Sequence, residues 1–179
     1  MTITINGTGT ITGISAGGLP DAIITQPELA SGVGGTGPAF SAYLASAQSV
    51  TSTTYTKAQI NTEEFDTNSN YDNSTNYRFT PTVAGYYQID GCLGFATTGS
   101  ISGGCFCTIY KNGSRFKDGI FTTGTQGTNF YSVVSSLIYF NGSSDYIELW
   151  GYVTATGTIT FNVNSGTVSY FQGVLVRGA

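Results

Sequence analysis

The sequence contains no histidine, and only 9% of its 179 residues are charged. Without histidine, nucleophilic catalysis by a Ser-His-Asp or Cys-His arrangement is impossible. The acidic residues give no enzyme signature either. Glu63 and Glu64 would face opposite sides of a strand, whereas a glycosidase needs two carboxyl groups about 5–10 Å apart across a cleft. We interpret these acids as a solvated edge and expect the protein not to be an enzyme.

Runs of basic residues and long apolar runs are also missing. The chain has six Lys and Arg and a net charge of −4, which argues against nucleic acid as a partner. No apolar run reaches the roughly 20 residues that a membrane helix needs, so we expect no membrane partner. Residues 1–4 lack the basic start and apolar core of a signal peptide. We therefore expect assembly in a cytoplasm.

Cysteine is scarce, and its spacing is informative. The three residues are Cys92, Cys105 and Cys107. The last two lie two positions apart, so in a strand their side chains would be parallel neighbours and a poor disulfide pair. We interpret all three as small buried hydrophobes. A disulfide or metal role stays open, although no histidine exists to complete a mixed zinc site.

The chain is instead rich in glycine and aromatic residues, with 25 Gly, 12 Tyr and 11 Phe. This composition favours β-structure with tight turns. The most informative stretch begins at Phe79: Pro81 and Gly85 punctuate it, and Tyr87 and Ile89 then share one face of a strand. About ten short strands separated by turns predict an all-β fold, a two-sheet jelly-roll sandwich.

Alternation and turn residues place the individual strands. Asn112-Gly113 between two such segments predicts a hairpin. Residues 45–57 are rich in Ser and Thr and are expected to form a loop. We expect strands at residues 39–44, 59–66, 85–96, 104–111, 130–140, 145–153, 158–163 and 169–176.

Residues 1–37 differ from the rest of the chain. Isoleucine alternates with threonine near the start, but the segment is too small to hold its own core. Residues 32–38 read as a flexible, glycine-rich hinge. We expect residues 1–37 to be an arm that attaches to a partner, and residues 38–179 to be the head; a disordered tail is the alternative. The expected attachment residues are Ile3, Ile5, Ile11, Ile14 and Leu19.

Several motifs of the head resemble the C1q-like domain. Phe79, Gly85 and Tyr87 match that family's spacing of Phe, five residues and Gly-x-Tyr. Residues 39–44 resemble its first strand and residues 169–176 its closing strand, although Ile89, Gly91 and Val174 stand where the family usually has aromatics. The resemblance implies a C1q/TNF-like jelly roll and a homotrimer. The implied core and trimer residues are Phe40, Phe79, Gly85, Tyr87, Phe171 and Gly173.

Residues 9–21 resemble the beginnings of short phage tail-fibre proteins. This resemblance implies a virion structural protein, most simply a tail-fibre or receptor-binding protein whose partners are other virion proteins and a host surface glycan or protein. A capsid cement or decoration protein is the alternative, because no shaft separates arm and head. A secreted C1q-type ligand is a third possibility, against which the missing signal peptide and collagen repeat count.

Residues 67–76 are the most polar stretch of the chain and predict a long exposed loop distal to the arm. Asn and Asp side chains form hydrogen bonds with sugar hydroxyls, and a tyrosine ring stacks on a sugar face. A solvated loop without a partner is the alternative, and Ca²⁺ bound by side-chain oxygens is the one cofactor considered. The candidate receptor-binding residues are Asn68, Asn70, Tyr71, Asp72 and Asn73.

Overall fold

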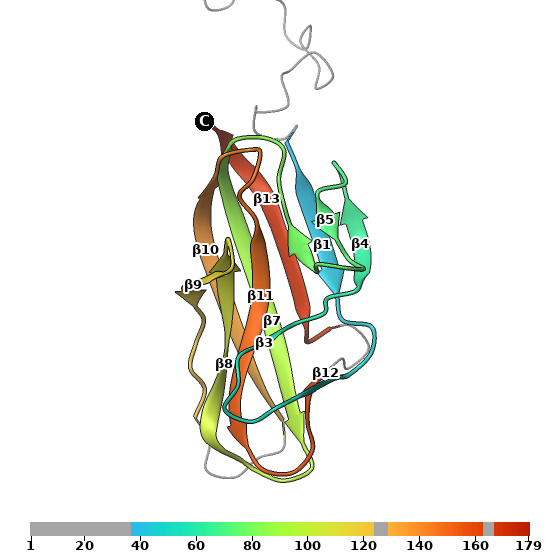
Figure 1. The fold of residues 1–179 in the computed structure, drawn as a ribbon, viewed down its shortest axis with the longest axis vertical. Helices are drawn as coiled ribbons and strands as arrows, with labels where there is room; N and C mark the ends of the chain where they lie inside the picture. Colours follow the sequence, from blue (N-terminus) through green and yellow to red (C-terminus); the bar gives the residue numbers. More distant parts are fainter. Residues whose placement is uncertain (1–36, 124–128, 163–166) are drawn as a thin grey trace, which may run out of the picture.

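The computed structural model describes residues 37–123, 129–162 and 167–179, which form two antiparallel β-sheets packed face to face (Figure 1). No helix among these residues could cross a membrane. Sheet A contains β1 (Ala39–Tyr43), β2 (Gln48–Val50), β4 (Thr62–Asp66), β7 (Gly85–Thr97), β10 (Asn129–Phe140), β12 (Ile159–Asn162) and β13 (Tyr170–Gly178). Sheet B contains β3 (Thr56–Lys57), β5 (Tyr71–Asp72), β6 (Arg78–Phe79), β8 (Ile101–Lys111), β9 (Ser114–Asp118) and β11 (Ile147–Ala155).

Sheet A is organised around β7. One edge of β7 pairs with β10 along twelve residues, from Phe140 opposite Gly85 to Asn129 opposite Ala96. The other edge pairs first with β13 and then with β12. Strands β1 and β4 extend the sheet beyond β13, and β2 extends it beyond β12. The long strand at residue 85 is therefore the strand on which half of the sandwich is built.

Sheet B is organised around β11, which pairs with β8 on one edge and with β3 and β6 on the other. Strand β9 returns along β8 through a two-residue turn. Asn112 and Gly113 have φ values of 52° and 77°. Positive φ at both central residues is the requirement of a type I′ hairpin turn, which confirms the expected hairpin.

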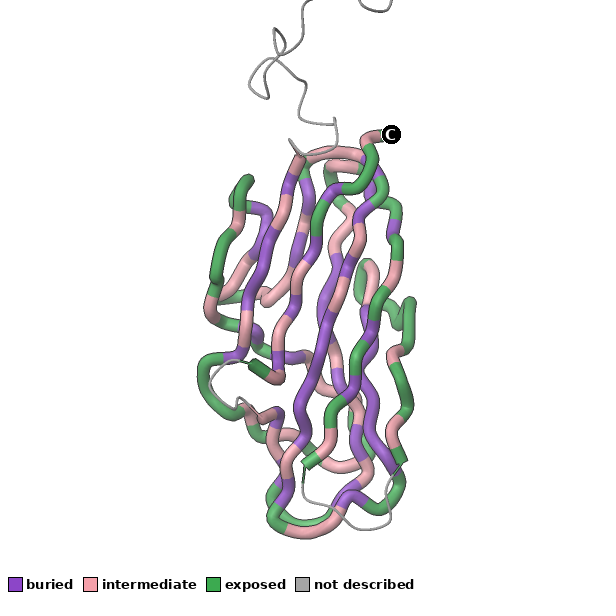
Figure 2. The backbone as a smooth tube through the Cα atoms, turned by 180° about the vertical axis from the view of Figure 1, so that it is seen from behind, coloured by how far each residue is buried: buried purple, intermediate pink, exposed green. Residues whose placement is uncertain are grey.

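The core lies between the sheets. Along the long strands buried residues alternate with more exposed ones, as the pleat requires (Figure 2). Phe40 stacks on Phe79, with ring centroids 4.3 Å apart, and meets Phe171 edge to face. The Tyr87 hydroxyl donates to the Val83 carbonyl, so this buried phenol is satisfied. Each fully buried ring of this kind contributes roughly 1.5–3 kcal/mol through burial alone.

Two glycines of the core are required by close packing, since neither has a positive φ. A Cβ added at Gly85 would collide with the Arg177 carbonyl oxygen and lie 2.7 Å from Leu175 Cδ1. A Cβ added at Gly173 would lie 2.9 Å from Phe40 Cε1. Neighbouring strands therefore approach these positions more closely than any side chain allows.

The jelly-roll prediction is confirmed, and the long strands lie within a few residues of their predicted positions. Two local predictions were wrong. Residues 45–57 contain the short strands β2 and β3, and residues 67–76 contain β5. These strands are two or three residues long, too short to show a periodicity. The predicted arm lies outside the described residues except for Gly37.

Candidate interaction surfaces

The predicted receptor-binding loop is largely built into the fold. Tyr71 is only 6% exposed, stacks on Phe40 with centroids 4.9 Å apart, and donates from its hydroxyl to the Ile60 carbonyl. Its ring is therefore not free to stack on a sugar, and that prediction was wrong. Asn70 is also buried: its amide oxygen accepts from the Thr82 amide, and its amide nitrogen donates to the Asn68 carbonyl.

Asp72 has an equally structural role. The backbone amides of Thr75, Ser74 and Asn76 donate to its carboxylate, as does the Asn76 side chain. These hydrogen bonds, that from Thr75 first, hold the pKa of Asp72 well below its usual range. Asn68 and Asn73 are more accessible. Among the described residues, no group of three or more acidic or Cys side chains is placed to hold a metal ion.

The position of this loop also differs from the prediction. The Thr67 amide donates to the Ala39 carbonyl, and the Ala39 amide donates to Thr67 Oγ1. The loop therefore lies beside the start of β1, at the end of the sandwich where Gly37 enters (Figure 1). A contact surface distal to the arm has to be sought elsewhere.

The outer face of sheet A is apolar, and we call it the apolar face. It consists of outward side chains of β7, β10 and β13 that are 42–56% exposed. Tyr86 and Tyr139 pair across two strands, with ring centroids 5.4 Å apart. Its members are Tyr86, Tyr131, Val133, Leu137, Tyr139, Val174 and Val176. An exposed set of this kind on one sheet marks an interaction site more often than a solvated surface.

A polar group lies within the apolar face. Ser135 Oγ and Gln88 Nε2 both donate to Asp90 Oδ1, at 2.6 and 3.0 Å. Beside it, a hollow of about 280 Å³ reaches across to Phe65 and Val174. Asp90 is therefore the acidic group that any partner on this face would meet, and it is already hydrogen-bonded within the chain.

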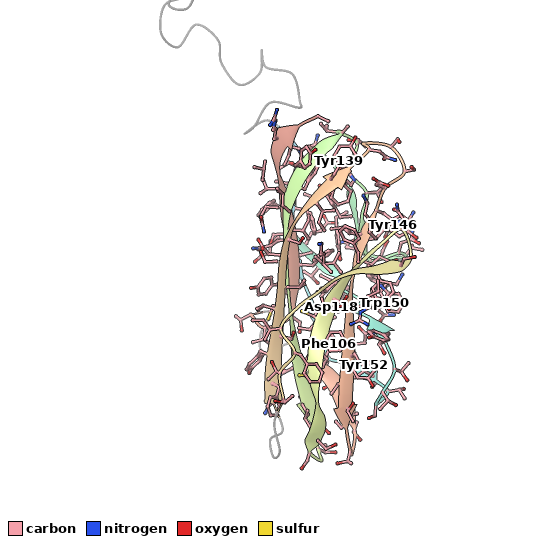
Figure 3. The ribbon with its side chains drawn as sticks, turned by 90° about the vertical axis from the view of Figure 1, so that its left-hand side faces the viewer. Phe106, Asp118, Tyr139, Tyr146, Trp150 and Tyr152 are labelled. Carbon is pink, nitrogen blue, oxygen red and sulfur yellow. The ribbon has the colours of Figure 1, made fainter. Side chains whose placement is uncertain are left out.

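The outer face of sheet B carries a second set of aromatic residues, the aromatic platform. Tyr110 stacks on Trp150 with centroids 4.4 Å apart and an interplanar angle of 19°. The ring centroid of Tyr152 lies 5.0 Å from that of Tyr55 and 5.5 Å from that of Phe106. Figure 3 shows Phe106, Trp150 and Tyr152 near one another on this sheet. The platform is defined as Tyr55, Phe106, Tyr110, Trp150 and Tyr152.

Charged groups hold these rings in place. Glu148 accepts from the Trp150 indole N–H and from Lys57, with which it forms an ion pair. The Arg115 guanidinium lies 5.2 Å from the centroids of both Tyr55 and Phe106 and pairs with Asp118. Hydrogen bonding from Arg115 lowers the pKa of Asp118. The platform is thus fixed before any partner arrives.

The three cysteines contribute to the core and not to a surface. All are free and buried, and Cys105 and Cys107 face the core from β8. Burial raises the pKa of each of these two thiols to about 12. A thiol with so high a pKa is protonated at neutral pH and is a poor nucleophile.

No protein-family model matches the sequence, and no curated protein matches it. Solved structures do match. The globular domain of zebrafish complement 1qA protein has a TM-score of 0.57 at 13% identity, covering 79% of this chain and 99% of that chain. Murine APRIL at pH 8.0 has a TM-score of 0.56 at 7% identity, covering 77% of this chain and 98% of that chain. The PRD1 vertex protein P5 gives 0.52 at 14% identity, with coverages of 78% and 97%.

The head has the C1q/TNF jelly-roll fold. The residues that carried the resemblance are core residues of this jelly roll: Phe40, Phe79, Tyr87 and Phe171 are each at most 1% exposed. They lie inside one chain, so contacts between chains have to come from outward residues. The jelly roll offers two such surfaces, the apolar face and the aromatic platform.

Sequence reasoning missed both surfaces in different ways. The sequence of residues 145–153 alternates so that Glu148 and Trp150 share one face of a strand, and in the structure they lie on one face and bond to each other. Tyr55 and Phe106 join them from distant positions through pairing of β11 with β3 and β8. For the apolar face, the every-second-residue pattern in β10 was the available signal.

Proposed function

We propose that this chain is a non-catalytic structural protein of a phage virion. Its jelly-roll head would self-associate as a homotrimer, attach to other virion proteins through residues 1–37, and present its remaining surface to the host. The observation that carries the proposal is the apolar face. Leu137 and Val176 are more than half exposed in the single chain, and burying such side chains stabilises an assembly.

The resemblance of the sequence to the C1q family supports three copies. Strand β10 contributes four outward apolar side chains, Tyr131, Val133, Leu137 and Tyr139, so one long strand would form much of each contact. Obligate interfaces of this kind bury on the order of 2,000–5,000 Å². Strand β10 itself contains no charged residue, which lowers the cost of removing its outer face from water.

The virion assignment is supported by the likeness to the vertex protein P5 of phage PRD1 and by the tail-fibre-like residues 9–21. A tail-fibre or receptor-binding protein is the form that we favour. A capsid cement or decoration protein is the second candidate. It is favoured by one observation: β1 begins at Ala39, so no shaft stands between residue 37 and the head.

Light scattering of the full-length protein tests the self-association. We expect a mass three times 18.7 kDa. A clean monomer at micromolar concentration would refute this part of the proposal.

Electron microscopy of intact particles, with the protein labelled, tests its location. Density at a tail or vertex tip supports receptor binding, and density spread over the capsid shell supports the decoration protein. Absence from purified particles would refute both.

A further inference from the structure

The aromatic platform stays free when the apolar face associates, because the two lie on the outer faces of different sheets. Its rings are ordered by contacts among themselves and by Glu148 and Arg115. A partner that binds there therefore causes little further loss of side-chain entropy. Four of the rings are partly exposed, and Phe106 lies buried beneath them, so a partner would meet ring faces that are already ordered.

The hydrogen-bonding groups of the platform indicate the chemistry of the partner. The hydroxyls of Tyr55, Tyr110 and Tyr152 have no hydrogen-bond partner among the residues that the structure describes. Each can donate to and accept from a ligand hydroxyl beside a ring face that packs against apolar C–H groups. A sugar ring presents both features, an apolar face and a rim of hydroxyls.

The charge distribution adds a second feature. The strands of sheet B contain five basic and three acidic residues, whereas those of sheet A contain one basic and four acidic residues. Lys57, Lys111 and Arg115 form ion pairs. Arg78 in β6 lies opposite Glu148 on the outer face of sheet B and forms no ion pair within the described part of the chain. Lys117 in β9 forms none there either, but it pairs with the core residue Ile109 and so lies on the other face of the sheet. Arg78 is therefore the cation beside the platform that stays without an ion pair within the described part of the chain.

We propose that the aromatic platform binds a polysaccharide chain that carries anionic groups. Sugar rings would pack on Trp150 and Tyr152, and carboxylate or phosphate groups would pair with Arg78. The platform lies on an open sheet face, which suits an extended chain better than a single sugar. This inference rests on the proposed function for one point only, that the polysaccharide belongs to a host surface.

Binding of the full-length protein to three polymers by titration calorimetry tests the proposal. Alginate supplies carboxylates, polyribitol phosphate supplies phosphates, and dextran is neutral. We expect binding to at least one of the two charged polymers, not to dextran, with affinity that falls as salt rises. Comparison of alginate with polyribitol phosphate identifies the anionic group.

Two variants locate the site. Tyr152→Ser removes a ring and should weaken binding at least about tenfold, the effect of losing a central aromatic contact. Arg78→Gln removes the positive charge of a guanidinium group that lies over the Tyr146 ring. We expect this change to weaken binding about threefold to tenfold. The matched control Arg177→Gln, in β13 of sheet A, should bind as the wild type does.

Three results would overturn the proposal: no binding to any polymer, equal binding to dextran, or unchanged binding by a folded Arg78→Gln variant. The result for Arg78→Gln tests the proposal even if the Tyr152→Ser variant fails to fold. If the protein is a trimer and enters particles but binds no polymer, polysaccharide binding by the platform is refuted and the proposed function stands. A monomer that binds alginate through Tyr152 and Arg78 would refute the proposed self-association alone.

Discussion

At the scale of single residues, the sandwich depends on positions where no alternative side chain fits. Three positions illustrate this. At Gly85 the neighbouring strand is too close for any side chain. Tyr71 has a buried hydroxyl that needs its carbonyl acceptor, and the carboxylate of Asp72 accepts hydrogen bonds from backbone amides. None of them lies on either proposed contact surface. Changes there should act on folding before they act on binding.

Gly85→Val should be among the most destabilising single substitutions. Its side chain would collide with the Arg177 carbonyl and with Leu175, so β13 would have to move away from β7. We expect a loss of more than about 3 kcal/mol in unfolding free energy, measured by urea denaturation. Ser102→Val, at an exposed position of β8, is the control and should change little. A Gly85→Val protein as stable as the wild type would contradict this account.

Tyr71→Ala should also destabilise the head. The change removes a ring stacked on Phe40 and leaves the Ile60 carbonyl without its donor. We expect a cost of about 3–5 kcal/mol in thermal or urea unfolding. Asn68→Ala, at an exposed position of the same loop, should cost less than about 1 kcal/mol. Equal effects of the two changes would mean that the loop is not built into the core.

The lowered pKa of Asp72 predicts that the protein loses stability in acid. The pKa of Asp72 is lower in the folded protein than in the unfolded chain. Its contribution to the free energy of unfolding is therefore complete above the unfolded pKa of about 3.9 and is lost as the pH falls through the pKa of the folded state. Unfolding free energy should decrease below about pH 4 in the wild type. In an Asp72→Asn variant the decrease should be smaller. Parallel pH profiles for the two proteins would refute the assignment.

At the scale of elements, β10 has two different faces. Its inward residues Val134, Ile138 and Phe140 join the core, and its outward residues remain exposed in the single chain. Part of its free edge is covered by residues 119–122, since the Ile120 amide donates to the Val133 carbonyl. Direct extension of sheet A past this part of β10 is thereby blocked.

Leu137→Glu tests the role of β10 in self-association. A carboxylate on the apolar face would have to be buried without a partner, which costs several kcal/mol per subunit. We expect the variant to remain folded, because Leu137 is 56% exposed, and to sediment as a monomer. Ser102→Glu, on an exposed position of sheet B, should leave the assembly intact. Persistence of the wild-type mass in Leu137→Glu would place the contact elsewhere.

The long strands were predictable from the sequence, because alternation over nine or more residues, as in β7 and β11, is a strong signal. Strands β3, β5 and β6 have two residues each and carry no such signal. The polar loop was misjudged for a related reason. Composition does not tell whether Asn70 and Asp72 bond to solvent or to their own backbone, and in the structure they bond to the backbone.

The aromatic platform could be predicted only in part. The alternation along β11 groups Trp150 with Glu148 on one face of the strand, but nothing in the sequence joins Trp150 to Tyr55 or to Arg115. That association depends on which strands pair and in which register. Pairing of Trp150 with Lys57 on one side and Thr108 on the other creates the surface.

At the scale of the whole molecule, the head should fold without residues 1–37. Near the start of the described chain, the Pro38 carbonyl accepts from the Leu175 amide. A chain that begins at Pro38 keeps this hydrogen bond, so its melting temperature should match that of the full-length protein within a few degrees. The same truncation should abolish incorporation into particles. Unfolding of the truncated chain would mean that the arm belongs to the core.

The two ends of the described chain lie at one end of the sandwich. Strand β1 starts there, and the Ala179 amide donates to the Ala84 carbonyl beside it (Figure 1). A peptide fused after Ala179 would therefore project near Gly37, where the proposed attachment arm joins the head, and would crowd it. The turn at residues 156–158, joined to Thr98 at the opposite end, is the better insertion point for displaying a foreign epitope on the outside of a particle.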